Sequence, residues 1–477
     1  MKRLAAPLFF LCLLLASIPH HSWAKITLPY FFSDNMVLQQ QTDAAIWGWG
    51  KSGSPVQITS SWNKKKYSTT ADASGKWKLK ISTPTAGGPY TITISDGETL
   101  LLNNVLIGEV WLCSGQSNME MPMKGYRDQP ILGSNDAIFN STNSHIRLYT
   151  VPRSVQRTPL DTSKNSPWKL AGPETVSNFS ATAYFFARIL YEQLRVPIGM
   201  VNISYGGSPV EAFMDEQTLK SFPEIKVPLA TDTGRMNNRT PTVLYNGMLH
   251  PFLGFTIKGC LWYQGESNND RPAQYEKLFP AFVQQIRDQS GQGDIPFYYC
   301  QIAPYNYNNY AAVNAVNNNS AYLRDAQRKA LAKIQNSGMA VLMDIGEEFN
   351  IHPSDKLTGG KRLAYMALAK TYGKKGFASE SPAYESIAFG NGAATIKFSN
   401  APNGLTSYGK PMMLFEIAGS NKIFRPAKAV ITAGTVVVSA PDVKEPAAVR
   451  YAFKDYVVGD LFSTEGFPVS SFRTDDW

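Results

Sequence analysis

A serine stands at the end of a pattern typical of a buried strand. The apolar run 105–114 is short, rich in valine, isoleucine and leucine, and is stopped by Gly115 in the sequence Gly-Gln-Ser-Asn-Met. Such a run predicts a strand of a parallel sheet that is buried on both faces. Open α/β sheets place their chemistry beyond the carboxyl ends of their strands. Ser117 is therefore a candidate nucleophile.

Three further apolar runs end in residues that would serve the same reaction. Acyl transfer by serine needs a base in contact with the nucleophile and N–H donors aimed at the developing oxyanion. The runs are followed by Gly206-Gly207-Ser208, by Gln264-Gly265-Glu266-Ser267-Asn268, and by Asp344 with His352 eight positions later. A nucleophile, a glycine corner, an amide corner and an imidazole on successive strand ends predict a serine esterase.

The histidine count narrows the choice of the base. Beyond residue 24 the only histidines are His145, His250 and His352. His352 follows the last strand-like run, and in triads that begin with the serine the histidine commonly comes last. An ordinary imidazole base predicts a pH profile that rises through roughly 6–7. Ser117 does not lie in a Gly-x-Ser-x-Gly elbow, because Met119 occupies the place of the second glycine.

The elements that must position these residues predict an α/β fold. Strand-like runs near 105–113, 198–204, 256–263, 296–302 and 339–344 alternate with segments of helical spacing. This alternation is typical of a parallel sheet flanked by helices. An Asn/Tyr-rich stretch from 305 to 320 precedes a helical segment, and we expect this stretch to line the site.

The two ends of the mature chain have β character. Residues 25–104 alternate apolar and polar positions between turn signals, which predicts a β-sandwich domain. The α/β domain then extends over 105–385. Residues 386–477 form a β-rich region that either stands alone or packs with the first β domain.

Residues 1–24 have the composition of a signal peptide. A Lys-Arg start is followed by an apolar core and by Ser22-Trp23-Ala24, which offers small residues at a cleavage site. The apolar core is too short to span a bilayer. We expect an exported protein, periplasmic or secreted, without a membrane anchor.

Composition argues against several other classes of function. The net charge is +9, but no dense Lys/Arg block accompanies it, so nucleic acid is not expected as a partner. Cys113, Cys260 and Cys300 lie in apolar runs without a Cys-x-x-Cys pair, which predicts buried free thiols. No histidine spacing suits a metal, so neither a metal nor a cofactor is expected.

The four segments together resemble the conserved blocks of sialate O-acetylesterases, within the SGNH-hydrolase superfamily. The blocks are Gly108 to Glu120 around Ser117, Tyr205 to Ala212, Trp262 to Asn268, and Ile351-His352-Pro353 with Lys356. The likeness covers nearly all of the chain after residue 24. It implies an SGNH-like α/β sheet and a carbohydrate esterase.

The resemblance also implies roles for individual residues. Ser117 would be the nucleophile and His352 the base. The oxyanion donors would be the N–H groups of Ser117 and Gly207 and an amide from Gln264 or Asn268. The superfamily's last block is Asp-x-x-His, but Phe349 stands three residues before His352. Four carboxylates remain candidates for the third triad member, and a Ser–His dyad is the alternative; the candidates are Asp344, Glu347, Glu348 and Asp355.

The expected substrate is an O-acetylated sugar, with sialic acid first. Similar blocks occur in esterases acting on xylan and other plant glycans, and a non-catalytic glycan-binding protein is a third reading. A sialic acid carries a carboxylate, which proteins normally bind through an arginine. The candidates near predicted loops are Arg127, Arg147, Arg235, Arg239 and Arg271.

Overall fold

A central parallel sheet carries the predicted strand ends. The computed structural model describes residues 25–307 and 319–477, so the predicted signal segment and most of the stretch 305–320 lie outside the described residues. The sheet has the order β13-β12-β11-β7-β10-β8-β9, and only β9 is antiparallel to its neighbour. Its strands are β7 (Thr99–Gly115), β8 (Asn143–Thr150), β9 (Lys169–Ala171), β10 (Ile198–Ser204), β11 (Gly259–Tyr263), β12 (Phe297–Cys300) and β13 (Ser337–Ala340). The predicted α/β fold class is confirmed.

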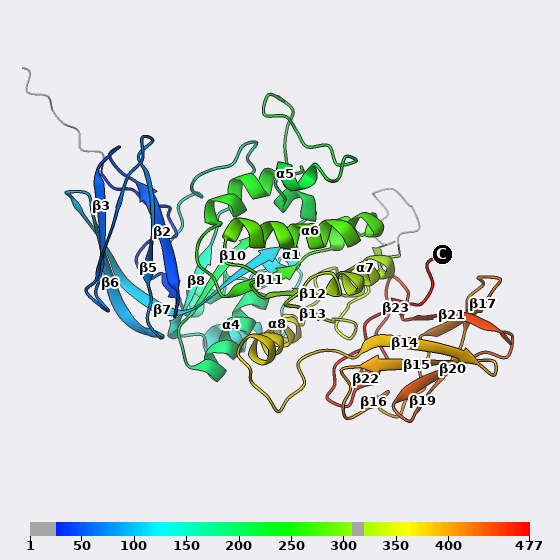
Figure 1. Cartoon of the computed structure of the whole chain (residues 1–477). Coiled ribbons are helices and arrows are strands. Elements are labelled where there is room, and N and C mark those ends of the chain that lie inside the picture. The colour runs from blue at the N-terminus through cyan, green and yellow to red at the C-terminus, as the bar shows by residue number, and fades with distance from the viewer. Residues whose placement is uncertain (1–24, 308–318) are drawn as a thin grey trace, which may run out of the picture.

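Helices cover both faces of this sheet, as predicted. Figure 1 shows α6 (Pro272–Ser290) and α7 (Ala321–Leu331) on one side, and α4 (Ala181–Leu194) and α8 (Lys356–Met366) on the other. Alternate residues of β7 enter two separate cores. Leu112 packs in the cluster that contains α6, and Trp111 in the cluster that contains α4 and α8. Burial on both faces explains why this strand is an unbroken apolar run.

The shorter helices lie mostly in the connections beyond the strand ends. They are α1 (Ser117–Glu120), α2 (Ser134–Phe139), α3 (Pro173–Val176), α5 (Glu216–Leu219), η1 (Val210–Phe213), η2 (Tyr245–Leu249), η3 (His250–Phe252), η4 (Glu266–Asn268) and η6 (Ala367–Thr371). Three of these short helices lie at the predicted polar segments. α1 starts at Ser117, η1 comes directly after the glycine corner, and η4 spans Glu266–Asn268.

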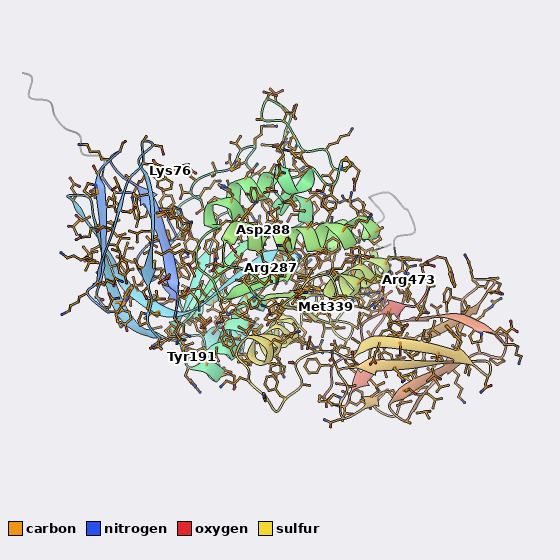
Figure 2. All side chains as sticks on the ribbon, in the orientation of Figure 1. Lys76, Tyr191, Arg287, Asp288, Met339 and Arg473 are labelled. Atoms are coloured by element: carbon orange, nitrogen blue, oxygen red, sulfur yellow. The ribbon has the colours of Figure 1, made fainter. Side chains whose placement is uncertain are left out.

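The amino-terminal β region is joined to the central sheet by one continuous strand. It contains β1 (Val37–Gln39), β2 (Asp43–Trp49), β3 (Pro55–Ser60), β4 (Lys66–Thr70), β5 (Lys76–Ser82) and β6 (Gly87–Ser95). The first half of β7 pairs with β6, and its second half pairs with β10 and β11. The predicted boundary at 104/105 therefore falls inside a strand. Lys76 of β5, labelled in Figure 2, adds an ion pair of 2.9 Å to Asp161.

The carboxyl-terminal β region lies at the other end of the molecule (Figure 1). It consists mainly of two four-stranded sheets, β14-β15-β20-β19 and β18-β17-β21-β23. Their bounds are β14 (Ala383–Gly390), β15 (Ala393–Ser399), β17 (Phe415–Gly419), β18 (Arg425–Pro426), β19 (Lys428–Thr432), β20 (Thr435–Ser439), β21 (Pro446–Tyr451) and β23 (Phe472–Arg473), with a small pair β16 (Leu405–Thr406) and β22 (Phe462–Ser463). Among the described strands, none of this region pairs with β1 to β6.

A buried arginine connects the carboxyl-terminal region to the α/β layer. Arg324 of α7 is fully buried and donates to Ser471 Oγ at 3.0 Å, to the carbonyl of Asp455 at 3.2 Å and to the carbonyl of Lys454. Arg473 of β23, labelled in Figure 2, lies 3.4 Å from Asp325 of the same helix. The charge of Arg324 is thus spread over several acceptors, as burial of a charged group requires. Across residues 25–307 and 319–477, no helix is long and apolar enough to cross a membrane.

Candidate active site

The position of Ser117 depends on a close approach of two strands. Gly115 ends β7 with a φ of +141°, and a Cβ atom on it would lie 2.1 Å from the carbonyl oxygen of Tyr263 on β11. Only glycine fits this approach. The chain then turns, the Gln116 N–H donates to the same Tyr263 carbonyl at 3.1 Å, and α1 begins at Ser117. As the first residue of α1, Ser117 has an N–H without an acceptor inside the helix.

The structure brings Ser117 and His352 together. His352 Nε2 lies 2.7 Å from Ser117 Oγ, although 235 residues separate the two in the chain. His352 stands in the loop between β13 and α8, where Asn350 Oδ1 accepts a hydrogen bond of 3.1 Å from its backbone N–H. An imidazole nitrogen at this distance can take the proton of the serine hydroxyl.

The other imidazole nitrogen contacts a glutamine, which the sequence analysis did not identify. His352 Nδ1 lies 2.6 Å from Gln129 Oε1, in the loop between α1 and α2. An amide oxygen only accepts hydrogen bonds, so this contact assigns the proton to Nδ1 and leaves the Nε2 lone pair facing Ser117. The Tyr126 ring packs edge-on against the imidazole, with 5.5 Å between centroids. No motif marks Gln129, because its loop is brought to His352 only by folding.

The four candidate carboxylates make other contacts. Asp344 forms two hydrogen bonds of 2.7 Å with Arg362, and Asp355 accepts from the backbone and side chain of Thr358 at the start of α8. Glu347 accepts from the N–H and Oγ of Ser354, and Glu348 from Asn306. Within the described part of the chain none of the four accepts a hydrogen bond from the His352 ring. Phe349, at the place of the superfamily's aspartate, is 77% exposed.

The surroundings of His352 disfavour its protonation. Burial, followed by the nearby charge of Lys356, lowers the pKa of His352 to about 4. Gln129 is neutral and supplies no charge to stabilise an imidazolium, unlike an aspartate in the same place. The free imidazole is therefore kept neutral well below the range of 6–7 expected for an ordinary histidine.

A buried polar cluster lies next to Ser117, around the side chain of Asn118. Asn118 donates to Glu266 Oε1 at 2.5 Å and accepts from Lys356 Nζ at 2.6 Å, so its side chain bridges the two charged residues. Lys356 also donates to the carbonyl of Pro353 at 2.7 Å, next to His352. Burial lowers the pKa of Lys356 to about 7 and raises the pKa of Glu266. The cluster fixes the segments of Ser117 and His352 relative to each other.

The glycine corner at Gly206 and Gly207 lies against Ser117. A Cβ on Gly206 would stand 3.3 Å from the Cβ of Ser117, and the Gly206 N–H donates to Glu120 Oε2 at 2.7 Å. Gly207 follows with a φ of +72°, a conformation that favours glycine. Its N–H has no acceptor among the hydrogen bonds of the described residues. The N–H groups of Ser117 and Ser208 likewise have no acceptor among the described residues, so the corner offers several free donors.

The two predicted amides brace this corner. Gln264 Nε2 donates to Asn268 Oδ1 at 2.7 Å and to the carbonyl of Ser208 at 3.2 Å, which uses both of its hydrogens. Asn268 Oδ1 also accepts from the Val210 N–H at 3.0 Å, and its Nδ2 donates to Glu211 at 2.8 Å. One hydrogen of Asn268 Nδ2 remains available. Both side chains are fully buried.

The other two histidines have separate surroundings. His145 stacks on Tyr191, and His250 Nδ1 lies 2.9 Å from the carbonyl of Leu160.

The three cysteines are buried and free. No group of three or more metal-ligating side chains occurs in residues 25–307 and 319–477. The cluster around Ser117 is thus the arrangement suited to nucleophilic chemistry.

Comparisons with known proteins identify the family of the chain. The sequence model of the family described as "Carbohydrate esterase, sialic acid-specific acetylesterase" matches residues 107–368, which includes every segment of the site. The chain belongs to this family. It is a carboxylic ester hydrolase, as predicted.

Relatives and a solved structure extend the match beyond the family region. The sialate O-acetylesterase of Homo sapiens is 30% identical over 402 residues, covering 75% of this chain and 73% of that protein. The Mus musculus sialate O-acetylesterase is 29% identical over 433 residues, or 79% of each chain. The crystal structure of a carbohydrate acetylesterase from Xanthomonas citri matches with a TM-score of 0.86 and 34% identity, covering 95% of this chain and 100% of that one. The fold of this esterase, including its β-rich ends, is therefore shared with an esterase of known structure.

The His352–Gln129 contact predicts how the imidazole titrates. In an NMR titration of this esterase, we expect the pKa of His352 to lie well below its ordinary value, and Gln129→Glu to raise it by about one unit or more. The reason is that a carboxylate at Nδ1 stabilises the imidazolium, whereas an amide does not. Arg127→Gln makes the same change in net charge two residues away, at a side chain that is 96% exposed, and should leave the titration nearly unchanged. Equal shifts in both variants would contradict a specific contact.

Proposed function

We propose that this esterase removes O-acetyl groups from sialic acids through an acetyl-enzyme formed on Ser117. The observation that carries the proposal is the 2.7 Å contact of His352 Nε2 with Ser117 Oγ, beside a glycine corner with free N–H donors. Family membership supports the chemistry. The human and mouse relatives are named sialate O-acetylesterases, which supports sialic acid as the sugar of the substrate.

The reaction follows from the positions of the two groups. Ser117 Oγ attacks the acetyl carbonyl while His352 Nε2 takes the hydroxyl proton. The same proton then passes from His352 to the sugar oxygen, so that the sugar leaves as an alcohol and acetyl-Ser117 remains. A water molecule next attacks the acetyl group, gives its proton to His352, and acetate leaves when the proton returns to Ser117.

The backbone of the corner supplies the donors for the oxyanion. The N–H groups of Ser117 and Gly207 are the first candidates, because neither is used within the described fold. The remaining hydrogen of Asn268 Nδ2 is the third. Gln264, whose two hydrogens both donate elsewhere, acts by holding Asn268 and the Ser208 carbonyl in place. Donors fixed in this way stabilise the tetrahedral state without reorganising.

Gln129 takes the place of the third triad member in this proposal. It orients the imidazole and selects the Nδ1–H tautomer, but it does not neutralise the imidazolium that forms during the reaction. The low pKa of His352 keeps the base unprotonated in mildly acidic solution. kcat/KM should therefore fall only as the pH approaches about 4, since protonation of His352 removes the base.

Replacing Ser117 or His352 tests the two catalytic roles. Ser117→Ala and His352→Ala should each lower kcat for para-nitrophenyl acetate by about a thousandfold or more, and the double variant should lose little beyond either single one, because the two groups act as a unit. His250→Ala is the control, since its imidazole contacts the Leu160 carbonyl instead. Additive losses, or an active Ser117→Ala enzyme, would refute this assignment.

Release of acetate from different sugars tests the substrate. O-acetylated sialic acid should be cleaved with a higher kcat/KM than acetylated xylooligosaccharides. The reverse order would replace the sialate proposal with the plant-glycan alternative. Specific binding of glycans without release of acetate from either would instead favour a non-catalytic binding protein.

We propose as well that the protein is exported, to the periplasm or the medium, after cleavage behind Ala24. The support is the Lys-Arg start, the apolar core and the small residues of segment 1–24. The mass of the protein recovered from the producing cells should then correspond to a chain that begins at Lys25. A mass that includes residues 1–24 would contradict export by this route.

A further inference from the structure

Arg153 lies beside the glycine corner, close to Ser117. It was not among the arginines suggested by the sequence. It follows the end of β8 by three residues, on the same edge of the sheet as Ser117 and Gly206. Its Nε donates to Glu120 Oε1 at 2.6 Å, and the other oxygen of Glu120 accepts the Gly206 N–H at 2.7 Å. Gly206 in turn stands against Ser117. A short chain of contacts therefore fixes the guanidinium relative to the nucleophile.

One aromatic ring stacks against the same guanidinium. It lies 4.5 Å from the centroid of the Tyr205 ring, in the geometry of a cation–π contact. The Glu120 ion pair and the nearby Tyr205 and Tyr126 groups raise the pKa of Arg153. Tyr126 is the residue whose ring packs on His352. The guanidinium thus shares its neighbours with both members of the Ser–His pair.

Part of this guanidinium is free to bind a ligand. The Arg153 side chain is 54% exposed, and no acceptor among the described residues takes a hydrogen bond from its Nη1 or Nη2. The Glu120 carboxylate, by contrast, is 15% exposed and has both oxygens bonded. Two more cations lie close by, because Arg239 donates to the Gly207 carbonyl at 2.9 Å and Lys164 to the Arg153 carbonyl at 3.2 Å. The entrance to the corner therefore has an excess of positive charge.

Three of the arginines suggested by the sequence have other partners. Arg147 is buried and donates to the Ser144 carbonyl at 2.6 Å. Arg271 pairs with Glu211 at 2.8 Å, and Arg127 lies 3.5 Å from Asp128 at a highly exposed position. Arg239 uses Nη1 on the glycine corner. The fifth candidate, Arg235, is exposed, and no hydrogen bond of its side chain occurs among the described residues. Unlike these five, Arg153 combines a fixed Nε, a free pair of Nη groups and contact with residues that surround Ser117.

We infer that Arg153 binds the carboxylate of an acidic sugar while the acetyl ester of the same molecule lies at Ser117. This inference rests on the proposed function and adds the residue that selects an anionic substrate. The two free Nη groups of a fixed guanidinium match the two oxygens of a carboxylate. Tyr205, stacked with the guanidinium, offers an aromatic face beside the same position. A neutral acetylated sugar gains nothing from Nη1 and Nη2.

The test compares two substrates that differ only at the carboxylate. O-acetylated sialic acid and its C1 carboxamide have the same acetyl ester, and the ratio of their kcat/KM values measures recognition of the charge. For the wild-type enzyme we expect a ratio on the order of tenfold to a hundredfold. In Arg153→Gln the ratio should fall towards one, mainly through a higher KM for the acid. Arg127→Gln is the control. It also removes one positive charge, but from a highly exposed side chain, and should keep the wild-type ratio.

Each alternative outcome has a distinct signature. A ratio near one in the wild-type enzyme, or an unchanged ratio in Arg153→Gln, would overturn the inference while leaving the esterase proposal intact. Preference of the wild-type enzyme for acetylated xylooligosaccharides over both sialic acid derivatives would instead overturn the sialate substrate. If Arg153→Gln also loses activity on para-nitrophenyl acetate, its substrate ratio no longer reports on the carboxylate alone, and the ratio is then measured for Arg153→Lys. Lysine keeps the charge but not the two-pronged geometry, so a reduced, intermediate ratio supports the inference and a wild-type ratio refutes it.

Discussion

The active site depends on the close approach of β7 and β11 at Gly115. Because a side chain at this position would collide with the Tyr263 carbonyl, glycine is required for the two strands to meet where the sheet ends. The turn that follows places Ser117 at the start of α1, beside the end of β10 with its glycine corner. The sheet order puts β11 and β10 on either side of β7, so the amide corner and the glycine corner flank the serine from opposite sides.

Electrostatics at the site favour a neutral imidazole. The partner at Nδ1 is an amide, and the nearest buried cation, Lys356, opposes protonation further. Burial also lowers the pKa of Lys356, to about 7. In the proposed reaction, the charged intermediate is stabilised mainly at the oxyanion, since Gln129 brings no negative charge.

Long-range connections hold the layers of the molecule together. β7 belongs to the amino-terminal sheet in its first half and to the catalytic sheet in its second, so displacement of one part would be felt in the other. The carboxyl-terminal region is attached through Arg324 and Arg473 to α7, which covers the catalytic sheet. Both β-rich regions are therefore joined to the α/β layer by buried contacts.

The sequence by itself indicated five of the seven strands of the central sheet, the α/β class and the family. The class and the family are confirmed, and the five strands overlap their predicted ranges, whereas β8 and β9 are not among those five. The sequence also indicated Ser117, His352 and the glycine corner, because apolar periodicity and strand ends are local properties that survive without a structure. Only the tertiary structure decided what surrounds them. Gln129 and Arg153 lie on loops with no periodic signal, and Asp344, one of the four candidate carboxylates, is paired with Arg362. Contacts between side chains more than two hundred residues apart, such as His352 with Gln129, arise from loop packing that no spacing in the chain encodes.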